Sequence, residues 1–121
     1  MKSKARHKGA LLPRFRVMSG QDIALGPGKV ELLTHVKKTG SIGEAAKRMD
    51  MSYMRAWSLI QMMNACFKEP LVKSARGGHE RGGAALTKTG REALEFYRRL
   101  ERISLKESKD DWLALQKLLR D

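Results

Sequence analysis

The chain has 121 residues, enough for one domain but too few for two full ones. It carries 25 Lys and Arg against 13 Asp and Glu, and the formal net charge of +12 attracts polyanions such as nucleic acid. A chain kept soluble by its lysines is the alternative interpretation of that charge. No run of about 20 apolar residues predicts a membrane-spanning helix, and no apolar stretch follows the basic start as in a secretory signal. The single cysteine, Cys66, excludes an internal disulfide framework, so we expect a cytoplasmic protein without membrane contact.

The N-terminal part of the chain predicts an arm followed by a short hairpin. Residues 1–13 contain no acidic residue and hold Lys2, Lys4, Arg6 and Lys8, so they form either a solvated tail or an arm that tracks DNA. Residues 14–18 alternate polar and apolar side chains, which predicts a half-buried strand, and residues 23–25 suit a return strand. Gly26-Pro27-Gly28 then breaks the chain and can open a helix.

Two helices are predicted next. The first runs from about Gly28 to Lys38 and ends at Gly40, which is placed to take the left-handed conformation that closes many helices. Ser41 suits the N-cap of the second helix, and Glu44 three residues later completes the capping-box pattern. The apolar residues of the second helix recur at helical spacing: Ile42, Ala45, Ala46 and Met49.

A third helix follows after a tight turn. Asp50 suits the turn because Asp tolerates unusual backbone angles, and Ser52 can cap a helix that reaches about Asn64. Its inward-facing side chains are expected to be Ala56, either Leu59 or Ile60, and Met63.

The remainder predicts a hairpin and C-terminal helices. After Pro70, residues 71–75 and 84–86 suit two strands that flank the glycine-rich tip 76–83. Either Thr87 or Thr89 can cap a fourth helix with an apolar stripe of Ala93, Phe96, Tyr97, Leu100 and Ile103, and Glu92 would be the box partner of Thr89. A break near Ser108 precedes a last helix that holds Trp112, Leu115, Leu118 and Leu119. The fold class is therefore mainly α with a small β-hairpin wing: a winged helix-turn-helix with C-terminal dimerisation helices.

Residues 42–60 have the pattern of a helix-turn-helix. Small residues allow a close helix crossing, and apolar residues flank the turn. The third helix would then lie in the major groove of double-stranded DNA. The outward candidates for DNA contact are Ser52, Tyr53, Met54, Arg55 and Ser58. Arg55 leads them because a guanidinium can address both acceptors of guanine. For Tyr53 and Trp57 the pattern does not decide between packing within the domain and contact with a base.

The hairpin tip is the second candidate for DNA contact. Its glycines allow close backbone approach, Arg76 and Arg81 can contact phosphates, and His79 can add a hydrogen bond. No glycine-lysine-Ser/Thr pattern follows a strand, so a nucleotide-binding loop is not predicted. His7, His35 and His79 share no metal-ligand spacing, so we expect no metal and no cofactor.

Several of these short motifs together resemble a known family. They are Thr39-Gly40-Ser41-Ile42, Ala45-Ala46, Met51-Ser52-Tyr53, Ala56-Trp57, Met63-Asn64, Gly77-Gly78, Gly82-Gly83-Ala84 and Leu86-Thr87-Lys88-Thr89-Gly90. Across about residues 14–105 the chain resembles the N-terminal winged helix-turn-helix domain of the molybdate-responsive ModE regulators. It is more distantly similar to the LysR-type DNA-binding domain.

The resemblance implies a transcription regulator that binds a near-palindromic operator as a homodimer. It implies DNA contact by the third helix and the wing. It also implies dimerisation through the helix from Thr89 onward, where the stripe of Phe96, Tyr97, Leu100 and Ile103 exceeds what a small core needs. Such regulators carry a second, oxyanion-binding domain. Because the chain ends at Asp121, we expect no such domain and no molybdate binding.

The predicted organisation is a basic arm at 1–13, a DNA-binding domain at 14–88 and a helical dimerisation region at 89–121. We expect no enzyme, because no Ser/His/Asp or paired-carboxylate arrangement stands out. A non-sequence-specific nucleic-acid-binding or architectural protein, and a winged-helix module that docks onto another protein, remain the alternative functions.

Overall fold

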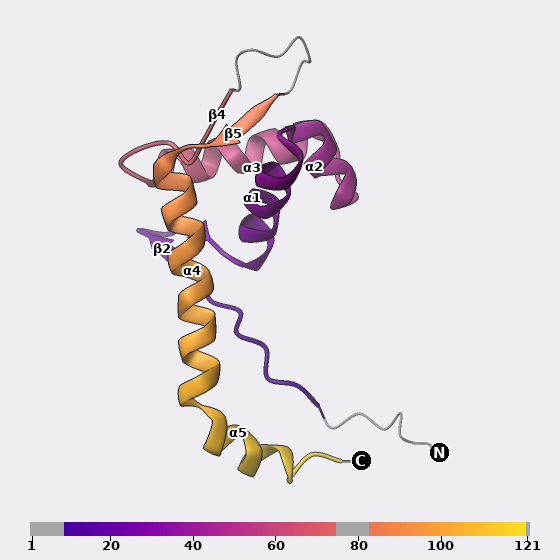
Figure 1. Cartoon of the computed structure of the whole chain (residues 1–121), viewed down its shortest axis with the longest axis vertical. Coiled ribbons are helices and arrows are strands. Elements are labelled where there is room, and N and C mark those ends of the chain that lie inside the picture. Colours follow the sequence, from indigo (N-terminus) through magenta and orange to yellow (C-terminus); the bar gives the residue numbers. More distant parts are fainter. Residues whose placement is uncertain (1–8, 75–82, 121) are drawn as a thin grey trace.

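A computed structural model of the chain describes residues 9–74 and 83–120. Within them a helical domain carries two small hairpins, and a long helix extends away from it (Figure 1). In chain order the elements are β2 (Val17–Ser19), β3 (Asp22–Leu25), α1 (Pro27–Thr39), α2 (Ile42–Arg48), α3 (Tyr53–Cys66), β4 (Val72–Ser74), β5 (Ala84–Leu86), α4 (Lys88–Glu107) and α5 (Lys109–Gln116).

The N-terminal segment is held at both of its described ends. The predicted alternation over residues 14–18 is present in the burial pattern, although the paired strand begins only at Val17. Further along the chain, the Tyr97 hydroxyl donates a hydrogen bond of 2.7 Å to the Phe15 carbonyl. Gly9, which was expected to belong to a mobile arm, lies against the side chains of Trp112 and Leu119. Residues 10–12 between these contacts are exposed, and residues 1–8 of the predicted arm lie outside the described part of the chain.

The ends of α1 and α2 follow the predicted signals, with one exception. Gly40 has φ +71 and closes α1 by donating its N–H to the Val36 carbonyl at 2.8 Å. Ser41 Oγ accepts the Glu44 N–H at 3.0 Å, as expected of an N-cap. The second hydrogen bond of the predicted capping box, from the Ser41 N–H to the Glu44 carboxylate, is not formed, because that carboxylate pairs with Lys47 at 3.4 Å. The Ser41 N–H donates to Thr39 Oγ1 instead.

The turn between α2 and α3 depends on one strained residue. Asp50 has φ +56, the single positive φ at a non-glycine residue in the described part of the chain. The N–H of Asp50 donates to the Lys47 carbonyl, and that of Met51 donates to the Ala46 carbonyl. Ser52 Oγ then accepts the Arg55 N–H at 3.1 Å and begins α3. The helix-turn-helix geometry predicted for residues 42–60 is confirmed.

The inner faces of the first three helices form the core. In α3 the buried side chains are Ala56, Ile60 and Met63, so Ile60 faces inward and Leu59 is only partly buried. They pack with apolar residues of the other elements, namely Leu25, Val30, Leu32, Leu33, Val36, Ile42, Ala45, Ala46, Leu71, Val72, Ala84, Leu86, Leu94 and Tyr97.

The wing is an antiparallel pair anchored by the end of α3. β4 and β5 pair in the register Val72 with Leu86, Lys73 with Ala85 and Ser74 with Ala84. Asn64 binds this pair to the helix, because its Oδ1 accepts the N–H groups of Leu71 and Val72, and its Nδ2 donates to the Val72 carbonyl. The predicted tip at 76–83 lies outside the described residues except for Gly83.

The start of α4 is locked against the residues before β4. Thr87, not Thr89, is the N-cap, and its Oγ1 accepts the Gly90 N–H at 2.9 Å. The Thr87 N–H also donates to the Leu71 carbonyl at 2.9 Å. A Cβ built on Gly90 would lie 2.1 Å from the Leu71 carbonyl oxygen, so only glycine allows this approach. α4 ends at Glu107, next to the break predicted at Ser108.

Replacement of Gly90 by Ala is expected to destabilise the fold by about 2–3 kcal/mol or more, because the Leu71 backbone must shift. Urea unfolding followed by circular dichroism measures this. Gly28→Ala is the matched control, since a Cβ there meets nothing within 4 Å. That control is expected to be neutral or to stabilise by up to about 1 kcal/mol. Equal stability of the two variants would contradict the close approach.

The pKa of Tyr97 is raised above its ordinary value of 10.0, first by burial and then by the nearby Glu101 carboxylate. The folded chain therefore keeps the phenol proton at a higher pH than the unfolded chain does. This contribution to stability is complete below pH 10 and is lost as the pH rises through the folded-state pKa.

Tyr97→Phe is accordingly expected to cost about 1 kcal/mol near neutral pH, through the lost hydrogen bond to Phe15, and progressively less above pH 10. Urea unfolding across this pH range is the measurement. Tyr53→Phe is the control for removal of a hydroxyl, because Tyr53 is exposed. A Tyr97→Phe deficit that stays constant with pH would contradict the assignment.

Candidate nucleic-acid interface

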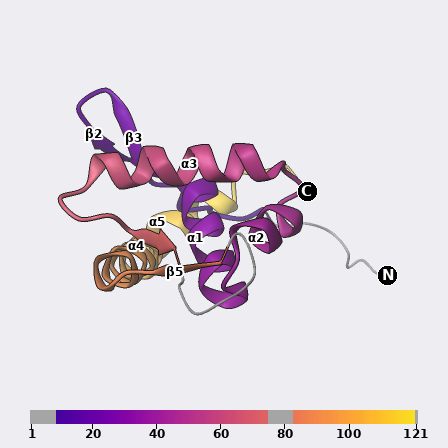
Figure 2. The ribbon, with the colours of Figure 1, turned by 90° about the horizontal axis from the view of Figure 1, so that it is seen from above.

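The outer face of α3 is accessible over its first two turns. Ala56 and Ile60 fix the inner face, so the helical period places Met54, Ser58 and Gln61 on the opposite side. All five predicted DNA contacts on this helix are exposed, namely Ser52, Tyr53, Met54, Arg55 and Ser58. Figure 2 shows α3 as a straight rod along one side of the domain, with the first hairpin at one end and α2 at the other. The helix can therefore approach a flat or grooved partner along much of its length.

Ser52 and Arg55 are positioned by the cap of α3. The Ser52 hydroxyl oxygen accepts the Arg55 N–H, which leaves the hydroxyl hydrogen available to an outside acceptor. Arg55 lies on the flank of the helix rather than at the centre of its outer face. It lines a hollow of about 290 Å³ together with Arg16, Lys29 and the first residues of α1. Lys29 Nζ donates to the Ile23 carbonyl.

This flank has the chemistry of a phosphate contact. Gly26 caps α1 without any side-chain hydrogen bond, so the first N–H groups of the helix have no side-chain acceptor. A helix N-terminus carries a partial positive charge, to which Arg16 and Arg55 add full charges. The arrangement suits one phosphate group better than a base edge.

The two aromatic side chains of α3 are partly packed and partly exposed. Tyr53 and Trp57 line a shallow hollow of about 130 Å³ between α3 and the wing, and each is 42% exposed. The prediction left these two residues open between packing and base contact. Their position allows both, since each residue lines the hollow beside the wing and is also partly exposed.

Two further polar residues on this side were missed by the sequence analysis. Gln61 continues the outer face after Met54 and Ser58, and its amide can pair with both groups of an adenine edge. Lys73 on β4 lines the same hollow as Trp57 and is exposed. The i, i+4, i+7 spacing of Met54, Ser58 and Gln61 was the signal that identifies Gln61. Nothing in the sequence pattern singles out Lys73.

The predicted wing contacts Arg76, His79 and Arg81 lie outside the described residues, so they remain predictions from sequence. The strands that lead to them place exposed Lys73 and Ser74 on the same side as Tyr53 and Trp57.

The exposed apolar side chains of α4 form a separate face. Phe96, Leu100 and Ile103 are 54%, 51% and 51% exposed, and Arg99 lies over the Phe96 ring at 5.4 Å. Tyr97, which was grouped with them, is only 1% exposed and packs in the core of its own domain. The reason is helical period, because Tyr97 lies three residues after the buried Leu94, on the inner face of α4, where its hydroxyl donates to the Phe15 carbonyl. We name Phe96, Leu100 and Ile103 the α4 face.

Other kinds of site are not found in the described part of the chain. Residues 9–74 and 83–120 contain no group of three or more His, Cys, Asp or Glu that could hold a metal ion. No described helix is long and apolar enough to cross a membrane. Cys66 is half-buried at the end of α3 and has no disulfide partner.

Comparison with known proteins shows the family of the chain. The family model for bacterial regulatory helix-turn-helix proteins of the lysR family matches residues 28–91. The DNA-binding transcriptional dual regulator ModE of Escherichia coli (strain K12) is 38% identical over 103 residues, which are 82% of this chain and 39% of that protein. The molybdenum transport protein ModE of Azotobacter vinelandii is 39% identical over 90 residues, 74% of this chain and 33% of that protein. The chain thus spans about two fifths of the length of these relatives or less.

Solved structures share the fold. The crystal structure of the CbnR DBD–DNA complex superposes with a TM-score of 0.56 at 22% identity, covering 73% of this chain and 95% of that one. The full-length CbnR complexed with its target DNA gives a TM-score of 0.53 at 23% identity, covering 72% of this chain and 28% of that one. At this level of identity the likeness is one of fold, and it assigns the described domain to the winged helix-turn-helix class.

Proposed function

Because the chain belongs to the bacterial regulatory helix-turn-helix proteins of the lysR family, we propose that it is a transcription regulator that binds a specific DNA sequence as a homodimer in the cytoplasm. The observation that carries the proposal is the exposed outer face of α3 beside the wing, on a chain with a net charge of +12. A helix presented in this way fits the major groove of B-DNA. The relative from Escherichia coli is named a DNA-binding transcriptional dual regulator, which supports the regulatory part of the proposal.

Roles within the interface follow from position. Ser58 and Gln61 at the centre of the outer face are assigned to base edges, with Tyr53 and Met54 beside them. Arg55 is assigned to the phosphate backbone, together with Arg16 and the N-terminus of α1, although the sequence alone favoured guanine. Ser52 can donate its free hydroxyl hydrogen either to a base edge or to a phosphate. Arg76, His79 and Arg81 are assigned to the backbone flanking the site.

Selection of the purified chain against random DNA duplexes with excess nonspecific competitor tests the proposal. An enriched inverted repeat is the expected result, because two copies related by a twofold axis read two equal half-sites. A pool that never enriches despite salt-sensitive binding would indicate a nonspecific nucleic-acid-binding protein. Absence of binding at low salt would indicate a module that docks onto another protein.

Arg55→Ala is expected to weaken binding to the selected site and to unrelated duplexes by similar factors, and to lower the salt slope by about 1. Gln61→Ala is expected to cost about 1–3 kcal/mol at the selected site and to relax the preference at one base position. Fluorescence anisotropy at several salt concentrations measures both effects. If Arg55→Ala relaxed the base preference and left the salt slope of binding unchanged, the result would indicate that Arg55 contacts a base edge and not a phosphate.

Homodimerisation is proposed through the α4 face, since more than half of each of its three side chains is exposed on a helix that extends beyond the domain (Figure 1). Exposed apolar side chains gathered on one face indicate a partner surface. A second copy of the same face is self-complementary in a twofold dimer.

Leu100→Asp is expected to weaken dimerisation by at least about a hundredfold, because an unpaired carboxylate would be buried twice in the interface. Sedimentation velocity over a range of concentrations measures the dissociation constant. Arg102→Asp, on an exposed position of the same helix outside the α4 face, is the control and is expected to remain dimeric. A Leu100→Asp chain that sediments as the wild type does would place the dimer contact elsewhere.

A further inference from the structure

Two helices far apart in the sequence enclose a hollow that none of the roles above uses. It has a volume of about 740 Å³ and lies between α1 and α4. α1 contributes Thr34, Lys37 and Lys38, and α4 contributes the six residues Lys88, Arg91, Glu92, Leu94, Glu95 and Arg98. The volume falls within the range of about 300–1,000 Å³ that is typical of small-molecule sites. The size therefore suits a small ligand.

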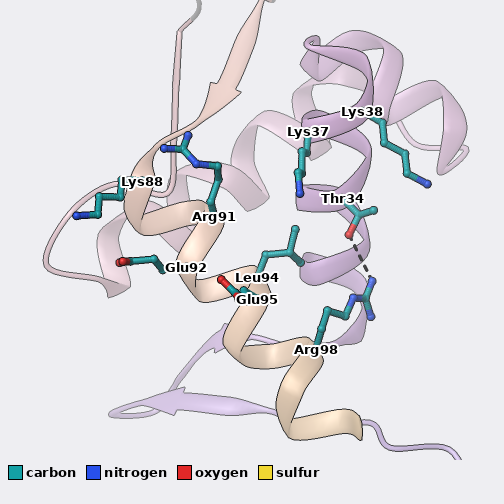
Figure 3. A pocket seen from close by; sticks show the side chains of 9 residues that line it. All are labelled: Thr34, Lys37, Lys38, Lys88, Arg91, Glu92, Leu94, Glu95 and Arg98. Atoms are coloured by element: carbon teal, nitrogen blue, oxygen red, sulfur yellow. Dashed lines mark hydrogen bonds between the residues drawn. The ribbon is translucent and has the colours of Figure 1, made fainter.

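The side chains around the hollow are arranged in two tiers. Figure 3 shows Lys37, Leu94 and Arg98 extending into the space between the helices, with Arg91 next to the end of β5. Lys38 and Lys88 point away from this space and form an outer rim. Leu94 is buried and supplies an apolar floor. The inner tier thus combines cations from both helices with one apolar surface.

The arginines of the inner tier are held in place. Arg91 Nη1 donates to the Leu86 carbonyl at 3.1 Å. Arg98 Nη2 donates to Thr34 Oγ1 at 3.3 Å, and its Nη1 pairs with Glu101 at 3.0 Å. Each guanidinium has five N–H donors, so these contacts orient the groups without using all their donors. Oriented arginines lose less conformational entropy when they bind an anion.

The charge around the hollow is unbalanced. Cations outnumber carboxylates five to two among the lining residues. Glu95 is paired with Arg99 at 3.5 Å, and no carboxylate within the described residues pairs with Lys37 or Arg91. Lys37 and Arg91 also line a second hollow of about 230 Å³ beneath β5, so they lie where the two hollows meet. A bound anion would relieve the repulsion that this grouping creates.

We propose that the hollow between α1 and α4 binds a small organic anion that carries a phosphate or carboxylate group beside a short apolar part. Lys37, Arg91 and Arg98 bind the anionic group, and Leu94 contacts the apolar part. The consequence for regulation rests on the proposed function: α1 belongs to the helix-turn-helix and α4 to the dimer contact. A ligand bound between them would fix the angle of α4 and thereby the spacing of the two recognition helices.

The position of the hollow favours a small ligand over a DNA phosphate. α1 contacts both α3 and α4, and in Figure 2 it lies between them. The hollow therefore opens on the side of α1 opposite to α3. A duplex read by the outer face of α3 would not lie over this hollow.

Calorimetric titration of the full chain with phenyl phosphate and with inorganic phosphate, at matched ionic strength, tests the proposal. Wild type is expected to bind phenyl phosphate more tightly than inorganic phosphate, because only the former contacts Leu94. Lys37→Gln is expected to weaken phenyl phosphate binding about tenfold. Lys106→Gln is the control with the same loss of charge, on an exposed position of α4 that lines neither hollow. Equal affinity of the two variants, or no binding of either probe to wild type, would overturn the site.

A second measurement separates this site from the DNA interface. The double variant Lys37→Gln/Arg91→Gln is expected to keep the wild-type salt slope of duplex binding. A slope lowered by about 2 would mean that both cations contact DNA phosphates, and the ligand site would be overturned. Lys37 makes no hydrogen bond or ion pair within the described residues, so its single variant tests the site without disturbing the fold. The titration needs no DNA, so its result stands whether or not the chain regulates transcription.

Discussion

The close contact between Gly90 and the Leu71 backbone is the constraint on which the arrangement of this chain depends. It allows the first turn of α4 to lie directly against the residues that enter β4. Thr87 completes the junction by capping α4 and donating its N–H to the Leu71 carbonyl. Since Asn64 of α3 binds the N–H groups of both Leu71 and Val72, one short segment joins α3, the wing and α4. The direction of the recognition helix, the base of the wing and the exit of the long helix are therefore fixed relative to one another.

Beyond this junction, α4 presents one face to the core of the domain and another face to solvent. Leu94 and Tyr97 face the domain, whereas Phe96, Leu100 and Ile103 face away from it. The same helix passes α1 at a distance that leaves the cationic hollow open between them. A change in the angle of α4 would therefore alter the hollow and the α4 face together. Proposed ligand binding and proposed dimerisation are linked by rigid geometry, because both use one helix that starts from one fixed point.

Much of the fold could be predicted from the sequence because its signals are local. Gly40, Ser41, Asp50 and Ser52 act on neighbouring backbone groups, so their roles follow from chemistry within four residues. The helix-turn-helix and the hairpin strands were located within a few residues for the same reason. The capping box failed in its second half because Glu44 had a competing partner, Lys47, one turn further along the helix. The outer face of α3 followed from helical period alone, which also contained the signal for Gln61.

Three features were decided by tertiary structure. Tyr97 shares the inner face of α4 with Leu94, and only folding brings its hydroxyl to the carbonyl of Phe15, a residue 82 positions away. Folding places Arg55 beside Arg16 and the start of α1, a neighbourhood that supports its proposed phosphate contact and that the sequence does not show. The cationic hollow joins Lys37 to Arg91, which no sequence pattern connects. By itself the sequence determined the elements, their caps and the helix-turn-helix, because each depends on nearby residues. Only the tertiary structure decided which residues of different elements meet, such as Tyr97 with Phe15 and Lys37 with Arg91, because that depends on contacts between segments distant along the chain.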